Sequence, residues 1–201
     1  MAYTFHFTSD EIVNILVSVV AISLALTLVY SGGVTKLVNS GPETFIALFA
    51  ISAFSIGIGF VLHESMHKYF AIKYGAWAQF QASPVGLLIG VLLALFLPFT
   101  FLSPGAVYIY SAGITRKQNG IISVVGPLTN IALCLLFVTI SLFAGGFAWI
   151  FALGAATNAW LALFNMLPFG PLDGTKVLAW DWRIWGAVTL AAFLLVGFIV
   201  F

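Results

Sequence analysis

The chain has 201 residues, of which 62% are hydrophobic and only 6% are charged, and its formal net charge is +1. About a quarter of the residues of a soluble globular domain are charged, so this composition excludes an ordinary soluble domain and predicts a polytopic membrane protein. The sequence has no basic patch of the kind that binds nucleic acid, which leaves the lipid bilayer as the expected surroundings.

The first predicted membrane span covers residues 12 to 35. Thr8 and Glu11 are spaced as a capping box, which predicts that this helix starts near Ser9. The second predicted span covers residues 44 to 62 and runs into the sequence GFVLHESMH, which ends at His67. Charged or strongly polar side chains in a membrane helix cost a few kcal/mol each, so this cluster indicates a function.

Within that cluster, His63 and His67 are four residues apart. On a helix both rings therefore lie on one face and can hold one metal ion. Glu64 is offset by about 100°, which keeps it out of the ligand set but close to a metal-bound water, where it can act as general base. The alternative is that the two rings are polar groups at a helix end that hydrogen-bond to their neighbours.

An apolar stretch of 17 residues, 86 to 102, follows the motif and contains Pro98. It is short for a span, and a re-entrant segment is the better interpretation. The flanking sequences WAQFQASPV and GAVYIYS carry aromatic and β-branched residues in partial alternation, which predicts two short paired strands near the active site. An exposed edge of such a sheet could bind an unwound substrate segment by strand addition.

The 55 uncharged residues from Gln118 to Leu172 hold two more predicted spans, and residues 184 to 201 form the last. The uncharged run closes in the sequence NMLPFGPLDG, where Pro168 and Pro171 disfavour helix, so the span should break there. Asp173 follows this break. An open zinc site needs three protein ligands and a water, which makes Asp173 the candidate third ligand. The alternative is a helix-ending loop with a surface aspartate.

These motifs resemble those of the site-2 protease family of intramembrane zinc metalloproteases. His63 to His67 is similar to the HExxH motif of that family, and Asn165 to Gly174 is similar to its second motif, in which Asn and Pro lead into Pro-x-Asp-Gly. The sequence GPLTN, Gly126 to Asn130, resembles the Gly-Pro-x-x-Asn opening of a core helix. The likeness covers roughly residues 45 to 180 of what we expect to be a single membrane-embedded domain, residues 1 to 201.

The resemblance implies one zinc ion per chain with three protein ligands, His63, His67 and Asp173. It further implies that Glu64 activates the water that cuts a peptide bond of a transmembrane protein substrate. Asn165 matches the motif Asn that would bind the substrate backbone or the developing oxyanion. A helix–helix hydrogen bond is the alternative role for Asn165, and it is the preferred role for Asn130.

The positions of the basic residues predict the topology, because Lys and Arg favour cytoplasmic loops. If residues 86 to 102 enter and leave on one side, only Lys36 lies opposite a face that gathers Lys68, Lys73, Arg116, Lys117, Lys176 and Arg183. If that stretch spans, the division is five against two. We therefore expect an all-α polytopic membrane protein with five to six transmembrane helices, one segment being re-entrant, and with a cytoplasmic N-terminus.

In this topology His63 lies about 28 Å along the second helix from Thr44, at 1.5 Å per residue. The active site is therefore expected near the cytoplasmic leaflet of the cell membrane, where water can reach it.

The sequence thus favours an intramembrane zinc endopeptidase. The alternative is a metal transporter or metal-binding membrane protein that uses the same three side chains as a transient site. A purely structural scaffold would leave both motifs unexplained. Glu64 separates the first two functions, because a hydrolase needs a general base and a transporter does not.

Overall fold

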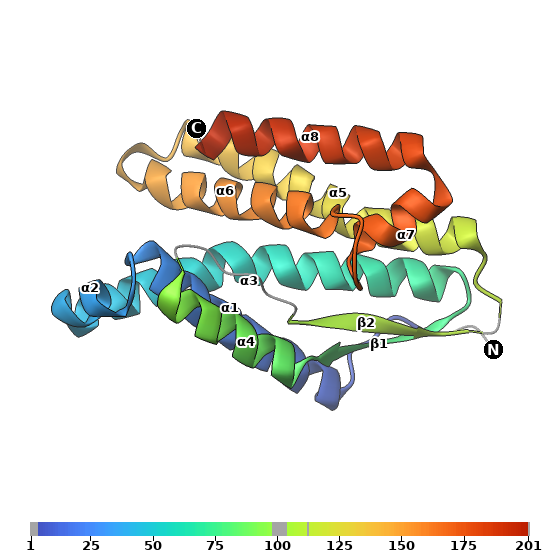
Figure 1. The fold of residues 1–201 in the computed structure, drawn as a ribbon, viewed down its shortest axis with the longest axis horizontal. Coiled ribbons are helices and arrows are strands. Elements are labelled where there is room, and N and C mark those ends of the chain that lie inside the picture. Colours follow the sequence, from blue (N-terminus) through green and yellow to red (C-terminus); the bar gives the residue numbers. More distant parts are fainter. Residues whose placement is uncertain (1–3, 98–103, 112, 201) are drawn as a thin grey trace. The chain divides into compact units, whose positions relative to one another are not determined.

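The computed structural model describes residues 4–97, 104–111 and 113–200 (Figure 1). Helices account for most of these residues, and two short strands interrupt them. In chain order the elements are α1 (Ser9–Tyr30), α2 (Val34–Asn39), α3 (Gly41–Lys73), β1 (Trp77–Ala82), α4 (Pro84–Phe96), β2 (Gly105–Tyr110), α5 (Arg116–Ser141), the 3-10 turn η1 (Gly145–Phe147), α6 (Ala148–Asn165), α7 (Asp173–Trp180) and α8 (Trp182–Val200).

Five helical segments of the described residues are long and apolar enough to cross a membrane: α1, α3, α5, η1 with α6, and α8. The predicted all-α polytopic membrane fold is therefore confirmed. Helix α3 continues beyond the apolar span predicted for residues 44 to 62 and through the HExxH motif to Lys73, so His63 and His67 lie on this helix as expected. The helix stops before Gly75, which has a φ of +79° and turns the chain toward β1.

The start of α1 is fixed by the predicted capping box. The Thr8 hydroxyl accepts a hydrogen bond from the Glu11 N–H at 3.3 Å, and the Glu11 carboxylate accepts one from the Thr8 N–H at 3.0 Å. The sequence did not lead us to expect the same arrangement at Thr115 and Gln118, where it starts α5. Each box satisfies N–H groups that a helix start otherwise leaves without partners.

The chain forms two compact units. Unit 1 consists of Met1–Phe5, Val61–Ala78 and Ile109–Phe201, and unit 2 of His6–Phe60 and Gln79–Tyr108. In unit 1, α5 packs against α6 and α7, and α8 packs against α6 and α7. In unit 2, α1 packs along α4. The expectation of a single domain stays a prediction.

Each unit has its own apolar cluster. Val124, Met166, Val177 and Val188 form the cluster in unit 1. Ala25, Leu28, Leu37 and Ala94 form the cluster in unit 2. The buried side chains of both clusters are thus all apolar, and Ala25 and Ala94 are of the small kind that lets membrane helices approach closely.

Strands β1 and β2 form a two-stranded sheet, as predicted. They run antiparallel, since the Ser83 N–H donates to the Pro104 carbonyl at 2.9 Å and the Trp77 and Tyr110 ring centroids lie 4.9 Å apart. Helix α4 leaves from this sheet. Its 13 residues extend about 20 Å, too short for a hydrocarbon core of about 30 Å. The chain therefore leaves the sheet and returns to it, as a re-entrant segment does; positions 98–102 of the predicted stretch lie outside the described residues.

The outer edge of β1 is hydrogen-bonded to α1 within unit 2. The Phe80 N–H donates to Glu11 Oε1 at 3.0 Å, and the Ala82 N–H donates to Asn14 Oδ1 at 3.1 Å. Glu11 is fully buried. One carboxylate therefore both caps α1 and occupies the edge of a strand nearly 70 residues away in sequence.

Candidate metal centre

The two histidines of the HExxH motif lie one turn apart on α3, and both are buried. Their Nε2 atoms are 2.9 Å from each other. The rings meet edge to face, with centroids 4.5 Å apart. Helical spacing has thus brought two imidazole nitrogens to one point, as the i and i+4 positions of His63 and His67 predict.

Asp173 reaches the same point from the break between α6 and α7. Its Oδ2 lies 3.2 Å from the His63 Nε2 and 3.1 Å from the His67 Nε2. Helix α6 ends at Asn165 and α7 begins at Asp173, so the predicted interruption of the span is present. Among the described residues, these three side chains form a group that could hold a metal ion.

Close packing of backbone on backbone fixes the position of this carboxylate. Gly174 lies against the carbonyl groups of Met166 and Leu167, where any Cβ atom would collide with them. The Trp185 indole N–H donates to the Met166 carbonyl at 2.8 Å. The glycine of the sequence PLDG therefore allows the start of α7 to rest on the irregular segment, and this contact places Asp173.

Each histidine is oriented through its other ring nitrogen. The His67 Nδ1 lies 2.7 Å from the Ile122 carbonyl oxygen, and the His63 Nδ1 lies 2.6 Å from Asn130 Oδ1. A carbonyl can only accept, so His67 carries a proton on Nδ1, and the neutral ring that would bind a metal therefore has its lone pair on Nε2, the atom that lies beside Asp173 and the other histidine. Partners of this kind hold metal-binding histidines in one tautomer.

The two contacts that orient the histidines were not predicted from the sequence. The Ile122 carbonyl is a backbone group and gives no signal in a sequence. Asn130 was assigned a helix–helix hydrogen bond, which it makes through its Nδ2 to Asn158 Oδ1 of α6 at 3.0 Å, but it contacts His63 as well. The only signal for Asn158 was its polarity within an apolar helix.

Gly126 gives the rings room. A Cβ atom at this position of α5 would lie 2.6 Å from the His63 Nε2 and 2.6 Å from the His67 Cε1. Real Cβ contacts are never so short, so a larger residue would have to displace at least one ring. The glycine of the GPLTN sequence thus leaves space beside both candidate ligand nitrogens.

The charge of Asp173 is favoured by its neighbours. Burial raises the pKa of its carboxyl group, but in the metal-free protein the positive charges of protonated His67 and His63 and hydrogen bonds from both rings lower it by more, so the net direction is well below the ordinary pKa. Lys176 adds a weak contact, with Nζ 3.7 Å from Asp173 Oδ1 and a side chain that is 40% exposed.

A known relative identifies the family of this chain. Over 200 residues, the sequence is 41% identical to a Methanocaldococcus jannaschii protein named "Putative zinc metalloprotease MJ0611", a match that covers 98% of the chain and 96% of that protein. The chain belongs to this zinc metalloprotease family. A Bacillus subtilis protein named "Putative zinc metalloprotease YwhC" is 26% identical over 140 residues, which is 60% of the chain and 64% of that protein. No protein-family model and no solved structure matches the sequence significantly.

The donor set of this metalloprotease fits zinc. Two imidazole nitrogens and one carboxylate oxygen are ordinary zinc ligands, and three protein ligands leave a fourth position open, as in catalytic sites. Ligand atoms about 2.0–2.1 Å from a tetrahedral zinc lie about 3.3 Å from one another. The observed separations among His63 Nε2, His67 Nε2 and Asp173 Oδ2 are 2.9, 3.1 and 3.2 Å. The family names and this geometry together support zinc as the cofactor.

The other two predicted site residues lie outside this ligand group. Glu64 is buried on α3 next to His63, and its carboxylate is not one of the three clustered ligand groups. Asn165, at the end of α6, donates from its Nδ2 to the Leu161 carbonyl of its own helix at 3.0 Å. The roles of Glu64 as base and Asn165 in substrate binding stay predictions.

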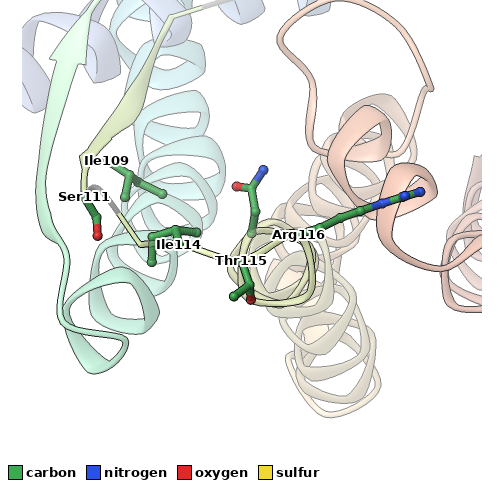
Figure 2. Close-up of a pocket in the computed structure, with 6 residues that line it drawn as sticks. Ile109, Ser111, Ile114, Thr115 and Arg116 are labelled. Atoms are coloured by element: carbon green, nitrogen blue, oxygen red, sulfur yellow. The ribbon is translucent and has the colours of Figure 1, made fainter.

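A surface hollow of about 390 Å³ lies elsewhere in unit 1 of the metalloprotease, where β2 leads into α5 (Figure 2). It is lined by Ile109, Ser111, Ile114, Thr115, Arg116 and Asn119. The Thr115 side chain is already engaged in the capping box, and in Figure 2 the Arg116 side chain extends away from Ile109 and Ser111. None of the predicted site residues lines this hollow.

Proposed function

We propose that the chain is an intramembrane zinc endopeptidase of the site-2 protease type, which cuts peptide bonds of transmembrane protein substrates. The observation that carries this proposal is the convergence of His63, His67 and Asp173 in a chain with five helices able to span a membrane. A hydrolytic metal site among such helices acts on substrates that share the membrane. The family relationship supports the same chemistry.

In this mechanism His63, His67 and Asp173 would hold the zinc ion through the three atoms that already face one another. The ion supplies a Lewis acid that polarises the scissile carbonyl and acidifies water. Glu64 takes the proton of the attacking water on its carboxylate and returns it to the leaving amine. Glu64 does not join the ligand group, so the same carboxylate that takes the proton from water can return it to the leaving amine without giving up a bond to the ion.

The substrate must be locally unwound before attack, since a helix hides its peptide bonds, and we propose that the unwound segment adds to the outer edge of β2. The edge of β1 is hydrogen-bonded to α1, whereas no side chain of the described residues hydrogen-bonds to β2. Because Ser83 pairs with Pro104, the N–H groups of even residues in β2 face β1, and those of Val107 and Ile109 face outward.

A proline at position 107 tests strand addition. Val107→Pro removes one outward N–H group without touching the pairing with β1, so cleavage should fall while zinc content stays at the wild-type level. Ala106→Pro, the control, removes an inward N–H and should disturb the sheet itself. Undiminished cleavage by Val107→Pro would eliminate this edge as the substrate site.

For Asn165 we propose a contact with the substrate backbone or the developing oxyanion. Its replacement by Leu keeps the size of the side chain and should lower cleavage with little change in zinc content. Equal cleavage by Asn165→Leu and wild type would leave Asn165 with only its bond to Leu161.

The proposed orientation has the N-terminus and the active site at the cytoplasmic side, as the distribution of basic residues favours. Single cysteines near Lys73, Arg116 and Lys176 should be labelled only from the cytoplasm, and a cysteine near Ser40 only from outside. Opposite labelling of the Lys73 and Arg116 positions would contradict the re-entrant topology.

The decisive experiment on the chemistry pairs metal content with cleavage of a model transmembrane substrate, for wild type and Glu64→Gln in detergent. The glutamine keeps the size of the side chain but removes the basic carboxylate. General acid–base assistance is worth about 10² to 10⁴ in rate, so cleavage should fall by at least that order. Zinc content should stay near the wild-type value, because no ligand has changed.

Other outcomes of these two measurements, metal content and cleavage, would count against the proposal. Undiminished cleavage by Glu64→Gln would refute Glu64 as the base. If wild type bound zinc but cut no transmembrane substrate, a transporter or metal-binding protein would be the better interpretation of the same three side chains. Loss of wild-type cleavage on adding a zinc chelator is the matching check on the metal.

A further inference from the structure

A chain of hydrogen bonds leads from His63 away from the metal centre, across α5 and into α6. The His63 Nδ1 lies 2.6 Å from Asn130 Oδ1, and Asn130 Nδ2 donates to Asn158 Oδ1 at 3.0 Å. Asn158 Nδ2 in turn donates to the Gly154 carbonyl at 2.9 Å. Asn130 and Asn158 are both fully buried. All four residues belong to unit 1.

The direction of this chain is set at its far end. The Gly154 carbonyl can only accept, so Asn158 must turn its NH₂ group toward it and its Oδ1 toward Asn130. That oxygen also only accepts, so Asn130 must present NH₂ to Asn158 and its own Oδ1 to His63. A backbone carbonyl of α6 thereby determines which end of each amide faces the histidine.

The consequence for His63 is chemical. Facing an oxygen, its Nδ1 must carry the proton, which leaves the lone pair on Nε2, the atom 3.2 Å from Asp173 Oδ2. If Asn130 turned over, its NH₂ group would face Nδ1 and favour the other tautomer, with a proton on Nε2. That tautomer cannot bind a metal through Nε2.

We propose that Asn158 is a positioning residue for metal binding: by fixing the direction of the Asn130 amide, it holds His63 in the tautomer that presents Nε2 to the ion. This inference rests on the proposed role of His63 as a zinc ligand. Asn158 acts through two hydrogen bonds and touches neither metal nor substrate. His67 needs no such relay, because its partner is a backbone carbonyl.

The test measures the zinc dissociation constant of the purified full chain in detergent, by competition with a chromogenic chelator. Asn158→Leu removes the hydrogen bonds to Asn130 and Gly154 at similar volume, and zinc affinity should fall about 10- to 100-fold, as is typical for partners of ligating histidines. Asn158→Asp keeps an oxygen toward Asn130, so affinity should stay within a few-fold of wild type. Simple loss of packing predicts the reverse order, because a buried acid is the more disruptive change.

The matched control is Thr129→Val, next to Asn130 on α5. It removes a hydroxyl that donates to the Val125 carbonyl of its own helix at 2.7 Å, and should leave zinc affinity unchanged. Melting temperatures of the metal-free variants show whether each protein folds. If Asn158→Leu does not fold, Asn158→Ala removes the same polar groups without adding bulk.

A double variant provides the sharpest check. In Asn130→Asp/Asn158→Leu the side chain at position 130 is a carboxylate, which presents an oxygen to His63 whichever way it turns. The tautomer of His63 then no longer depends on position 158, and zinc affinity should recover relative to Asn158→Leu. The proposal would be overturned if the double variant lost as much zinc affinity as the two single variants combined, or if Asn158→Leu bound zinc as tightly as wild type. Absence of zinc binding by wild type would instead refute the proposed metal site, and the two failures are therefore distinguishable.

Discussion

The candidate metal centre draws its side chains from two regions that are built in opposite ways. Helix α3 supplies His63 and His67 from 33 uninterrupted helical residues, where backbone hydrogen bonds alone fix the spacing of the rings. Asp173 follows an irregular segment, and its place depends on the contact of Gly174 with the Met166 carbonyl. Substitutions in the regular region should therefore change metal binding alone, whereas those in the irregular region should also change folding stability.

The largest effect is expected from removing a ligand in either region. His67→Ala and Asp173→Ala each leave two of three protein ligands, so zinc affinity should fall by more than the 10- to 100-fold typical of outer partners. Zinc content after dialysis, measured beside the melting temperature of the metal-free proteins, checks this. Full zinc content in Asp173→Ala would show that the third ligand is assigned wrongly.

Two glycine substitutions, one on α5 against the α3 histidine rings and one in the irregular region, should distinguish the two regions through smaller effects. In Gly126→Ala the new Cβ meets the His63 and His67 rings, which can rotate away when no metal holds them. Zinc affinity should therefore fall about 10- to 100-fold, the equivalent of the 1–3 kcal/mol typical of overpacking, with a smaller change in the melting temperature of the metal-free protein.

In Gly174→Ala the new Cβ meets backbone atoms of Met166 and Leu167, which cannot rotate away. The metal-free protein should lose about 1–3 kcal/mol of stability, seen as a lower melting temperature, and zinc binding should weaken as a result. Equal stability of the metal-free Gly126→Ala and Gly174→Ala proteins would remove the distinction between the two regions.

The smallest effect should come from Lys176→Met. The Lys176 Nζ lies 3.7 Å from Asp173 Oδ1, but its side chain is 40% exposed, and solvent screens such pairs to about 0–1 kcal/mol. Zinc affinity should change by no more than about fivefold, measured by the same chelator competition. A loss greater than tenfold would mean that this lysine helps to hold the carboxylate in place.

The features that the sequence could predict are those that depend on neighbouring residues in the chain. The start of α1, the strand pair and the break before Asp173 depend on local rules of capping, alternation and proline, and each was predicted at about the right residues. The helix that carries His63 and His67 was expected as well, whereas its end at Lys73, just before Gly75, was not predicted.

The groups that orient the histidines could not be predicted in this way. Every residue type has a backbone carbonyl, so the sequence does not single out that of Ile122. Its place beside His67 depends on how α5 packs against α3. Asn158 lies 95 residues from His63, and only the side-by-side packing of α5 and α6 connects them. Glu11 was interpreted correctly as a helix-start residue, yet its bond to the Phe80 N–H depends on tertiary contacts.

That bond limits how copies of this protein can associate. An open-ended stack of chains joined through their sheets needs two free strand edges in every copy, one for each neighbour. Glu11 and Asn14 occupy one of the two edges of this sheet. Edge-to-edge growth therefore stops at two copies, and a protein crowded in the plane of a membrane is protected against polymerising through the strands.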